Sequence, residues 1–393
     1  MTNTQRTAAK AAFAFVFAMG IVNLFADMTY EGGASINGPF LGSLGASAAA
    51  IGIIAGCGEF LGYSLRSLSG YVADRSGKYW LITFVGYFVN LLAVPAMALA
   101  GNWQIAALLL ILERVGRALR KPTVETMLSY SAGTLGRGWV YGLNTALDET
   151  GATVGPLLIA LALYLRATYR TGYSLLLISS LLALAALTAA RIVFPVPARL
   201  DTGAPTARGK GFTRQFWLSM LAAACFGAGL MSYEFISYHL SATGTFQPQW
   251  IPIGVALATV MSIVASLVLG RLYDRVGLPV VLGAIALAAL FSPLVFLGGF
   301  TVALIGLLLW GLGYFVQDTL LKAVVAGMLP EGRRSFAFGL FYAGYGAGWL
   351  VGSVVTGLLY AHSISAVIAF SVVVQLSAIP LFLLANRGAL KTV

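Results

Sequence analysis

Long apolar stretches separated by short polar segments run through the whole chain. A transmembrane helix needs about 20 consecutive, mostly apolar residues. Twelve stretches meet this length, and they cover residues 11–44, 48–70, 79–100, 103–129, 137–165, 171–193, 214–241, 249–270, 279–298, 301–328, 334–360 and 363–386. The pattern therefore predicts an all-α membrane protein with twelve transmembrane helices. The first stretch is long for one span, and Gly32, Gly33, Gly38 and Pro39 near its end permit a bend or a break.

A polar segment rich in Pro, Gly and basic residues separates the first six stretches from the last six. It predicts a six-helix bundle over 1–194, a cytoplasmic linker over 195–213 and a second six-helix bundle over 214–393. Internal repetition supports this division, because four residues recur at an offset of 270 − 70 = 200. An equal number of spans per half makes the repeats parallel, which implies pseudo-two-fold symmetry. The recurring residues are Gly70, Asp74, Arg75 and Gly77, and their copies are Gly270, Asp274, Arg275 and Gly277.

Charge is scarce and unevenly placed. Only 9% of the residues are charged and 59% are hydrophobic, so a soluble globular protein is excluded. The net charge of +11 indicates orientation in a membrane rather than binding of nucleic acid. With the N-terminus inside, the cytoplasmic segments hold sixteen basic residues and the opposite loops hold two. This predicts a multi-pass protein of the plasma (inner) membrane with both termini in the cytoplasm.

The segment GYVADRSGK, from Gly70 to Lys78, resembles the loop 2–3 signature of the major facilitator superfamily, and GRLYDRVGL, from Gly270 to Leu278, is a weaker copy. The resemblance implies a monomeric secondary transporter of a small molecule that alternates access between the two membrane sides and needs no cofactor. It also implies a cytoplasmic gate, in which the glycine lets helix 2 approach helix 11 and the charged residues form ionic latches. By this resemblance the gating residues are Gly70, Asp74, Arg75, Gly77 and Lys78, with Gly270, Asp274, Arg275 and Gly277 in the copy.

Several ionisable residues fall inside predicted spans. A charge at mid-membrane costs at least ~2.5 to 3.5 kcal/mol, so such groups should face a cavity or a partner. A buried carboxyl group that changes protonation as access alternates would couple transport to protons. The alternative is a structural network, which applies most to Arg66, Arg117, Arg120 and Lys121. The candidates for proton coupling are Asp27, Glu31, Glu59, Glu113, Asp148 and Glu149.

Other polar and aromatic residues lie on helices expected to line a central cavity, whereas helices 3, 6, 9 and 12 carry almost no charge and should face lipid. No metal site is predicted, because no second His or Cys lies at ligand spacing from His239. The candidates for the substrate cavity are Asn23, Tyr30, Tyr63, Arg114, Arg117, Asn144, Tyr233, Glu234, Tyr314, Asp318 and Trp349.

Helix 5 contains a GxxxGP element formed by Gly151, Gly155 and Pro156, whose small residues allow close helix packing and whose proline kinks the helix. It resembles the helix 5 motif of antiporter branches and favours proton-coupled efflux. ERVGRALRKP in helix 4 departs from the drug–proton antiporter motif, so an importer or facilitator of a small organic ion is the alternative. A membrane enzyme is disfavoured because no nucleophile–base set or phosphate loop appears. A non-transporting receptor is disfavoured because no loop is long enough for a signalling domain.

Overall fold

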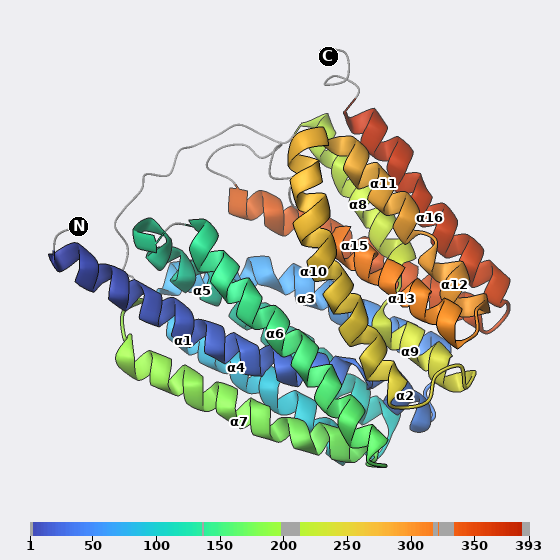
Figure 1. Ribbon diagram of the computed structural model, residues 1–393, viewed down its shortest axis with the longest axis horizontal. Coiled ribbons are helices and arrows are strands. Elements are labelled where there is room, and N and C mark those ends of the chain that lie inside the picture. Colours follow the sequence, from blue (N-terminus) through green and yellow to red (C-terminus); the bar gives the residue numbers. More distant parts are fainter. Residues whose placement is uncertain (1–2, 136, 198–212, 317–320, 322–333, 387–393) are drawn as a thin grey trace. The chain divides into compact units, whose positions relative to one another are not determined.

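The computed structural model describes residues 3–135, 137–197, 213–316, 321 and 334–386, with a few side chains inside these ranges left out (Figure 1). Almost every described residue is helical, and this part of the chain contains no strand. Eleven of the twelve predicted apolar stretches coincide with one helix or with two consecutive helices, and the stretch 301–328 begins as a helix and continues outside the described residues. The predicted all-α membrane fold is confirmed.

The helices of the first half follow one another with short connections. Thr168 begins one of them as its N-cap, because its side chain accepts a hydrogen bond from the amide of Thr171 (3.2 Å). The elements are α1 Asn3–Ala34, α2 Asn37–Ser43, α3 Ala48–Ser76, α4 Tyr79–Ala96, the short 3-10 helix η1 Met97–Leu99, α5 Trp103–Leu135, α6 Arg137–Tyr164 and α7 Tyr169–Val193.

The second half continues in the same way. Thr213, Ser232 and Ser363 act as N-caps here, each accepting a hydrogen bond from the amide three residues ahead. The elements are α8 Arg214–Leu230, α9 Tyr233–Ala242, α10 Trp250–Val276, α11 Leu278–Ala288, α12 Phe291–Leu297, α13 Phe300–Phe315, α15 Arg334–Tyr360 and α16 Ile364–Ala385.

Eight segments in the described part of the chain are long and apolar enough to cross a membrane, and two shorter apolar helices cover 250–265 and 300–315. The α5 and α15 helices have the length of a span but differ in composition. The first carries a cluster of charged residues and the second is rich in glycine and aromatic residues. The chain is thus a multi-pass integral membrane protein in which α5 is unusually polar.

Three predicted spans are broken within the residues that the structure describes. The break permitted by Gly38 and Pro39 occurs between α1 and α2. The break between α8 and α9 was not predicted, and it centres on Met231, which has a φ of 61°. The break between α11 and α12 was also missed, although Pro293 lies in the first turn of α12, where the missing amide hydrogen costs no helical hydrogen bond.

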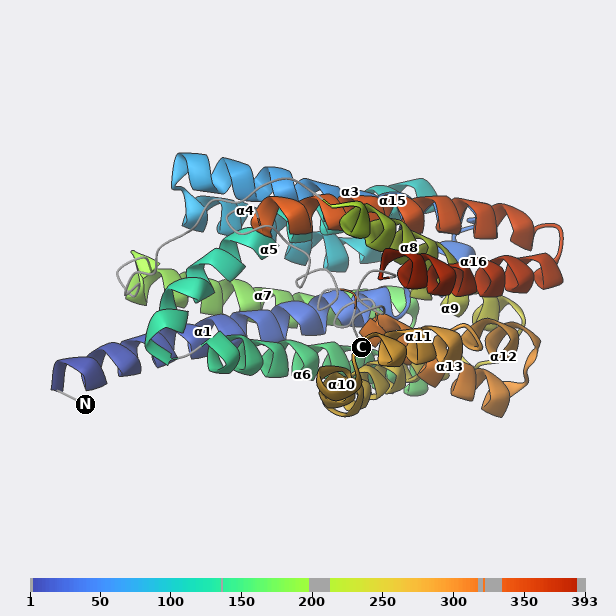
Figure 2. The ribbon, with the colours of Figure 1, turned by 90° about the horizontal axis from the view of Figure 1, so that it is seen from above.

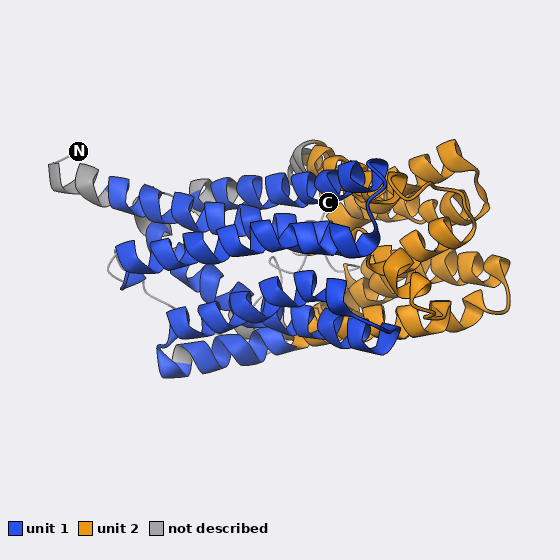
Figure 3. Ribbon diagram, turned by 90° about the horizontal axis from the view of Figure 1, so that it is seen from below, with its two compact units in different colours: residues 1–33, 65–206 blue, residues 34–64, 207–393 orange. Residues whose placement is uncertain are grey.

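The chain forms two compact units, coloured separately in Figure 3. Unit 1 comprises residues 1–33 and 65–206, and unit 2 comprises residues 34–64 and 207–393. Residues 34–64, which hold α2 and the first part of α3, therefore pack with the second half of the chain. The bundle boundaries at residues 194 and 214 stay a prediction. Within unit 1, α4 packs against α5 and α7.

Candidate functional site

A polar cluster, called the charged network here, lies within unit 1 among α1, α4, α5 and α6. Asn23 of α1 donates a hydrogen bond to Asn144 of α6 (2.8 Å) and accepts one from the hydroxyl of Tyr87 of α4. Three helices distant in sequence thus meet at one buried amide. The network's charged members are Asp27, Glu31, Glu113, Arg114, Arg117, Arg120, Lys121, Asp148 and Glu149.

Arg120 is the hub of this network and is only 3% exposed. Its Nη2 lies 3.4 Å from Oδ1 of Asp27 on α1, and its Nε donates to the side-chain oxygen of Asn90 on α4 (3.2 Å). The guanidinium also lies 4.6 Å from the ring centroid of Tyr87. One cation therefore joins a carboxylate, an amide and an aromatic ring from two other helices, an arrangement that satisfies a buried charge.

The fixed crossing of α4 and α5 positions these groups. A Cβ atom on Gly116 would lie 2.4 Å from the backbone nitrogen of Asn90, and one on Gly86 would lie 2.7 Å from that of Arg120. Only glycine allows two helices to approach this closely. The crossing holds Asn90 and Arg120 in register with each other.

Glu113 is bound on two sides. The amide nitrogen of Asn90 donates to its Oε1 (2.8 Å), and Nε of Arg114 lies 3.4 Å from its Oε2. Both Glu113 and Arg114 are buried. The arrangement therefore neutralises the Glu113 carboxylate within its own helix and through α4.

Tyr30 of α1 receives two arginines from α5. Arg114 donates to its hydroxyl (2.5 Å), and the guanidinium of Arg117 lies 4.1 Å from its ring centroid. Such a contact between a cation and the face of a ring is attractive. Glu31, next to Tyr30, has Asp27, Arg117, Arg114 and Glu149 as its electrostatic neighbours. Tyr30, Arg114 and Arg117, predicted separately as cavity residues, thus form one cluster.

Asp148 of α6 pairs with Lys121 of α5 at 3.6 Å and also lies within electrostatic range of Asp27. The α6 helix runs close to α1, since a Cβ on Gly151 would lie 2.1 Å from the carbonyl oxygen of Leu24. Gly155 is equally close to the carbonyl of Met28. The GxxxGP element therefore sets the distance between the two acidic helices of the network.

Tyr87 and Asn90 were missed as network residues because α4 carries no charge and was predicted to face lipid. Its outer face is apolar and exposed at Leu81, Val85 and Phe88, and its contact with lipid stays a prediction. The signal for an inner polar face was Thr83, Gly86, Tyr87 and Asn90 at spacings of three and four.

The remaining candidates for proton coupling and for the substrate cavity, within the described part, lie in unit 2. Glu59 is half-buried on α3, and Glu234 is buried in the first turn of α9. Tyr233 donates to the carbonyl of Ile251, and its ring lies 5.5 Å from that of Trp310 in a tilted contact. Tyr314, 38% exposed, makes a similar tilted contact with the same indole at 5.7 Å. Tyr63 and Trp349 belong to a second aromatic group between α3 and α15, and Asp318 lies outside the described residues.

The break between α8 and α9 is tied down by side chains. The indole N–H of Trp310 lies within hydrogen-bonding distance of the carbonyl oxygens of Leu230 (3.2 Å) and Met231 (3.1 Å). Ser371 and Gln375 of α16 both donate to the carbonyl of Gly229. Carbonyls released by the break thereby keep partners.

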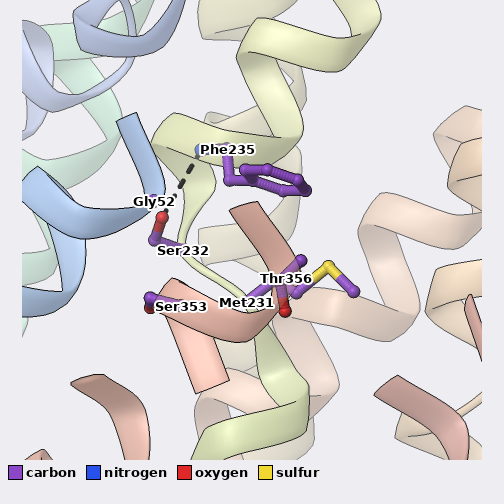
Figure 4. A pocket seen from close by; sticks show the side chains of 6 residues that line it. All are labelled: Gly52, Met231, Ser232, Phe235, Ser353 and Thr356. Carbon is purple, nitrogen blue, oxygen red and sulfur yellow. Dashed lines mark hydrogen bonds between the residues drawn. The ribbon is translucent and has the colours of Figure 1, made fainter. Parts of the chain in front are cut away.

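A small hollow adjoins this break (Figure 4). Gly52 of α3 and two hydroxyl residues of α15 meet there with the first residues of α9. The Thr356 hydroxyl is buried and has no hydrogen-bond partner in the part of the chain that the structure describes. The lining residues are Gly52, Met231, Ser232, Phe235, Ser353 and Thr356.

The two copies of the gating motif end their helices in the same way. Gly77 follows α3 with a φ of 65°, and Gly277 follows α10 with a φ of 76°, a conformation that glycine adopts without steric cost. Arg75 is exposed and donates to the hydroxyl of Tyr71 (2.9 Å). A Cβ on Gly70 would make only ordinary contact with Pro122 (3.6 Å), while Lys78 and Arg275 are exposed. The side chains of Asp74 and Asp274, and the surroundings of Gly270, lie outside the described part.

Known proteins are similar to this chain in sequence. The chain is 34% identical to an uncharacterised protein of Mycobacterium tuberculosis (strain ATCC 25618 / H37Rv). The alignment covers 94% of this chain and 92% of the relative. It is 27% identical to an uncharacterised MFS-type transporter of Methanocaldococcus jannaschii, with 88% of each chain covered.

Solved transporters have the same fold. A structure of a peptide transporter, POT, in complex with sulfate aligns with a TM-score of 0.75 at 15% identity, covering 96% of this chain and 94% of that one. The nucleoside transporter NupG aligns with a TM-score of 0.73 at 12% identity, covering 95% and 98%. Residues 11–324 match the Major Facilitator Superfamily, and the chain therefore belongs to that family of transporters.

Proposed function

We propose that this transporter is a proton-coupled exporter, which moves a small solute out of the cell in exchange for protons. It would act as a monomer in the plasma membrane with both termini in the cytoplasm, as the distribution of basic residues indicates. The observation that carries the proposal is the composition of the charged network. It brings carboxyl groups close to one another, because Asp27 lies within electrostatic range of Asp148, and Glu31 within range of Asp27 and Glu149, so like charges meet in a buried place. Taking up a proton removes that cost.

Asp27 is the leading coupling residue. Its side chain is 18% exposed, whereas that of Glu113 is 5% exposed, so Asp27 has the better access to water. Protonation of Asp27 would weaken its contact with Arg120 (3.4 Å) and would leave that guanidinium with Asn90 and Tyr87. Glu31, Glu59, Asp148 and Glu149 are further candidates, and Glu113 has the tighter set of structural partners.

The antiport direction is supported by the GxxxGP element. Its glycines bring α6 against α1, where both helices carry acidic residues of the network. The alternative is import or facilitated movement of a small organic ion, which the clustering of Arg114 and Arg117 on Tyr30 favours. The two directions differ in which pH gradient drives solute flux.

Proteoliposomes holding the full chain and an internal pH-sensitive dye test this proposal. We expect at least one solute of a chemically diverse library to dissipate a preformed pH gradient. The orientation of the pH gradient that drives solute flux then distinguishes export from import. Asp27→Asn, Glu31→Gln and Glu59→Gln should each reduce this proton movement. Glu125→Gln, at an exposed carboxylate of α5, is the matched control and should behave as the unmodified protein. Coupling through these residues is wrong if all three variants keep gradient-driven flux.

A further inference from the structure

The side chain of Asn90 on α4 lies between two charged groups of α5, and these two helices run side by side in Figures 1 and 2. Its Oδ1 accepts a hydrogen bond from Nε of Arg120 (3.2 Å), and its Nδ2 donates to Oε1 of Glu113 (2.8 Å). The same Nδ2 also donates to the backbone carbonyl of Glu113 (3.2 Å). One neutral amide therefore separates a buried cation from a buried carboxylate.

The orientation of this amide is fixed by its neighbours. A guanidinium can only donate hydrogen bonds, whereas an ionised carboxylate and a carbonyl can only accept them. A flipped amide would point its N–H groups at Arg120 and its oxygen at Glu113, and it would lose all three hydrogen bonds. Asn90 is also fully buried, and Gly86 and Gly116 hold its helix against α5. The amide is therefore locked between the two charges.

Without this amide the two charges would be able to pair with each other. Glu113 and Arg120 are seven residues apart, so they share a face of α5 and lie about 10.5 Å apart along its axis. Their long side chains already approach closely enough for one amide to contact both. Glu113 has Arg114 beside it (3.4 Å), and a second cation would add to that attraction. Asn90 thus keeps Arg120 away from a carboxylate of its own helix.

Arg120 meets Asp27 of α1 instead, with Nη2 lying 3.4 Å from Oδ1. The ring of Tyr87, three residues before Asn90 on α4, lies 4.6 Å from the same guanidinium, and its hydroxyl donates to Asn23 of α1. When Asp27 takes up a proton, Asn90 and Tyr87 still hold the guanidinium in place. Arg120 can therefore pair with Asp27 again when the proton leaves. The other charged groups within electrostatic range of Asp27 are Asp148, Arg117 and Lys121.

We propose that Asn90 is the positioning residue that reserves Arg120 for Asp27, and so makes Asp27 the carboxylate whose proton is exchanged during transport. Asn90 carries no charge and binds no proton, and it acts through Arg120. With an apolar residue in place of Asn90, Arg120 turns to Glu113, and proton exchange at Asp27 no longer makes or breaks the ion pair between α1 and α5. The inference rests on the proposed proton coupling and names the residue that selects its carboxylate.

Thermal unfolding of the purified full chain in detergent tests the pairing without any transport. Double-mutant cycles combine Arg120→Ala with Asp27→Asn and with Glu113→Gln, and they isolate the interaction of each pair as a change in Tm. We expect Arg120 to interact more strongly with Asp27 than with Glu113 in the unmodified protein. Asn90→Leu keeps the approximate size of the side chain and removes its hydrogen bonds. In this background the order of the two interactions should reverse.

Proteoliposomes test the consequence for proton coupling, with the solute that dissipates the pH gradient in the unmodified protein as the probe. Asn90→Leu should reduce proton movement at least about tenfold, while exchange of that solute without a pH gradient continues. Adding Glu113→Gln to Asn90→Leu should restore most of the proton movement, because Arg120 then has Asp27 as its remaining acidic partner. A purely structural role of Asn90 predicts no such rescue, since the second substitution removes a further polar contact.

The matched control is Thr83→Val, which removes another buried hydrogen bond between α4 and α5, from Thr83 to Thr123 (2.7 Å), and leaves those of Asn90 in place. It should change neither the order of the interactions nor the proton movement. If Asn90→Leu does not fold, Asn90→Ala takes its place. A stronger interaction of Arg120 with Glu113 than with Asp27 in the unmodified protein would by itself overturn the proposal.

The remaining outcomes separate this inference from the proposed function. An unchanged order of the interactions in Asn90→Leu, unchanged proton movement, or no rescue by Glu113→Gln would each refute the role of Asn90. A reversed order in Asn90→Leu, with no proton movement by the unmodified protein, would keep the pairing and refute the coupled transport. Proton movement that survives Asp27→Asn would keep the coupling and refute the selection of Asp27.

Discussion

The charged network of unit 1 and the aromatic seam of unit 2 hold helices together by different means. In the network, helices are joined by groups whose charge matters, such as Asp27 with Arg120 and Lys121 with Asp148. In the seam, which the first part of α3 forms with α15, contact is made by glycines and by the rings of Tyr63 and Tyr342. Both units use glycine for close crossings, so the difference lies in the polar groups. Proton uptake would alter the contacts of the network and leave most contacts of the seam unchanged.

Removing the hub of the network should have the largest effect on stability. Arg120→Ala leaves Asp27 without its buried cation, and breaking a buried pair in this way costs ~3–5 kcal/mol. Thermal unfolding of the purified protein in detergent should show a large fall in Tm. Adding Asp27→Asn should recover part of this loss, because the uncompensated charge is then absent.

The control for this prediction is a second pair in the same network. The side chain of Lys121 is 37% exposed, and exposed pairs are worth about 0–1 kcal/mol, so Lys121→Ala should lower Tm only slightly. Equal losses for Arg120→Ala and Lys121→Ala would contradict the view that burial makes Arg120 the hub. The same result would weaken the contrast between the two units.

A methyl group added at a close helix crossing should have the next largest effect on stability, and we expect this effect in unit 2. A Cβ on Gly352 of α15 would lie 2.0 Å from the carbonyl oxygen of Ala228 on α8. Since neither backbone has room to move freely, Gly352→Ala should destabilise the fold by ~1–3 kcal/mol, measured by thermal unfolding. Gly283 of α11 has no atom within 4 Å of the same position. Gly283→Ala should therefore stabilise the protein by up to about 1 kcal/mol, through helix propensity alone. A loss of stability for both variants would show that the close crossing of α8 and α15 is not the cause of the loss at Gly352.

Much of this contrast was visible in the sequence. Apolar run lengths predicted the helices, and Asn23, Asp27 and Glu31 lie four residues apart in the sequence, which puts them on one face of α1. The contacts between helices were not predictable. The spacing of residues along one helix shows which of them share a face, but it does not show which other helix packs against that face. Tyr87 and Asn90 show this, since their helix has no charge to mark them.

The breaks were predictable only where the sequence weakens the helix by itself. Gly38 and Pro39 marked the break after α1. The break at Met231 has no proline, and Gly229 two residues earlier does not by itself mark it; the break depends on donors from α13 and α16 that come close only in the folded protein. The local signal was a serine N-cap at Ser232 followed by Glu234 in the first turn, which favours a helix start.

The smallest expected effect concerns the indole of Trp310 at this break. Trp310→Phe keeps an aromatic ring beside Tyr233 but removes the single N–H that the carbonyls of Leu230 and Met231 share. A buried acceptor left without its donor costs about 1–3 kcal/mol, and we expect the low end because Met231 and Leu230 share one bond. Thermal unfolding measures the loss, with Trp217→Phe at an exposed position as the control expected to stay within about 0.5 kcal/mol. Equal Tm values for the two variants would mean that the indole N–H adds no stability at the break, and that Trp310 acts there through the packing of its ring.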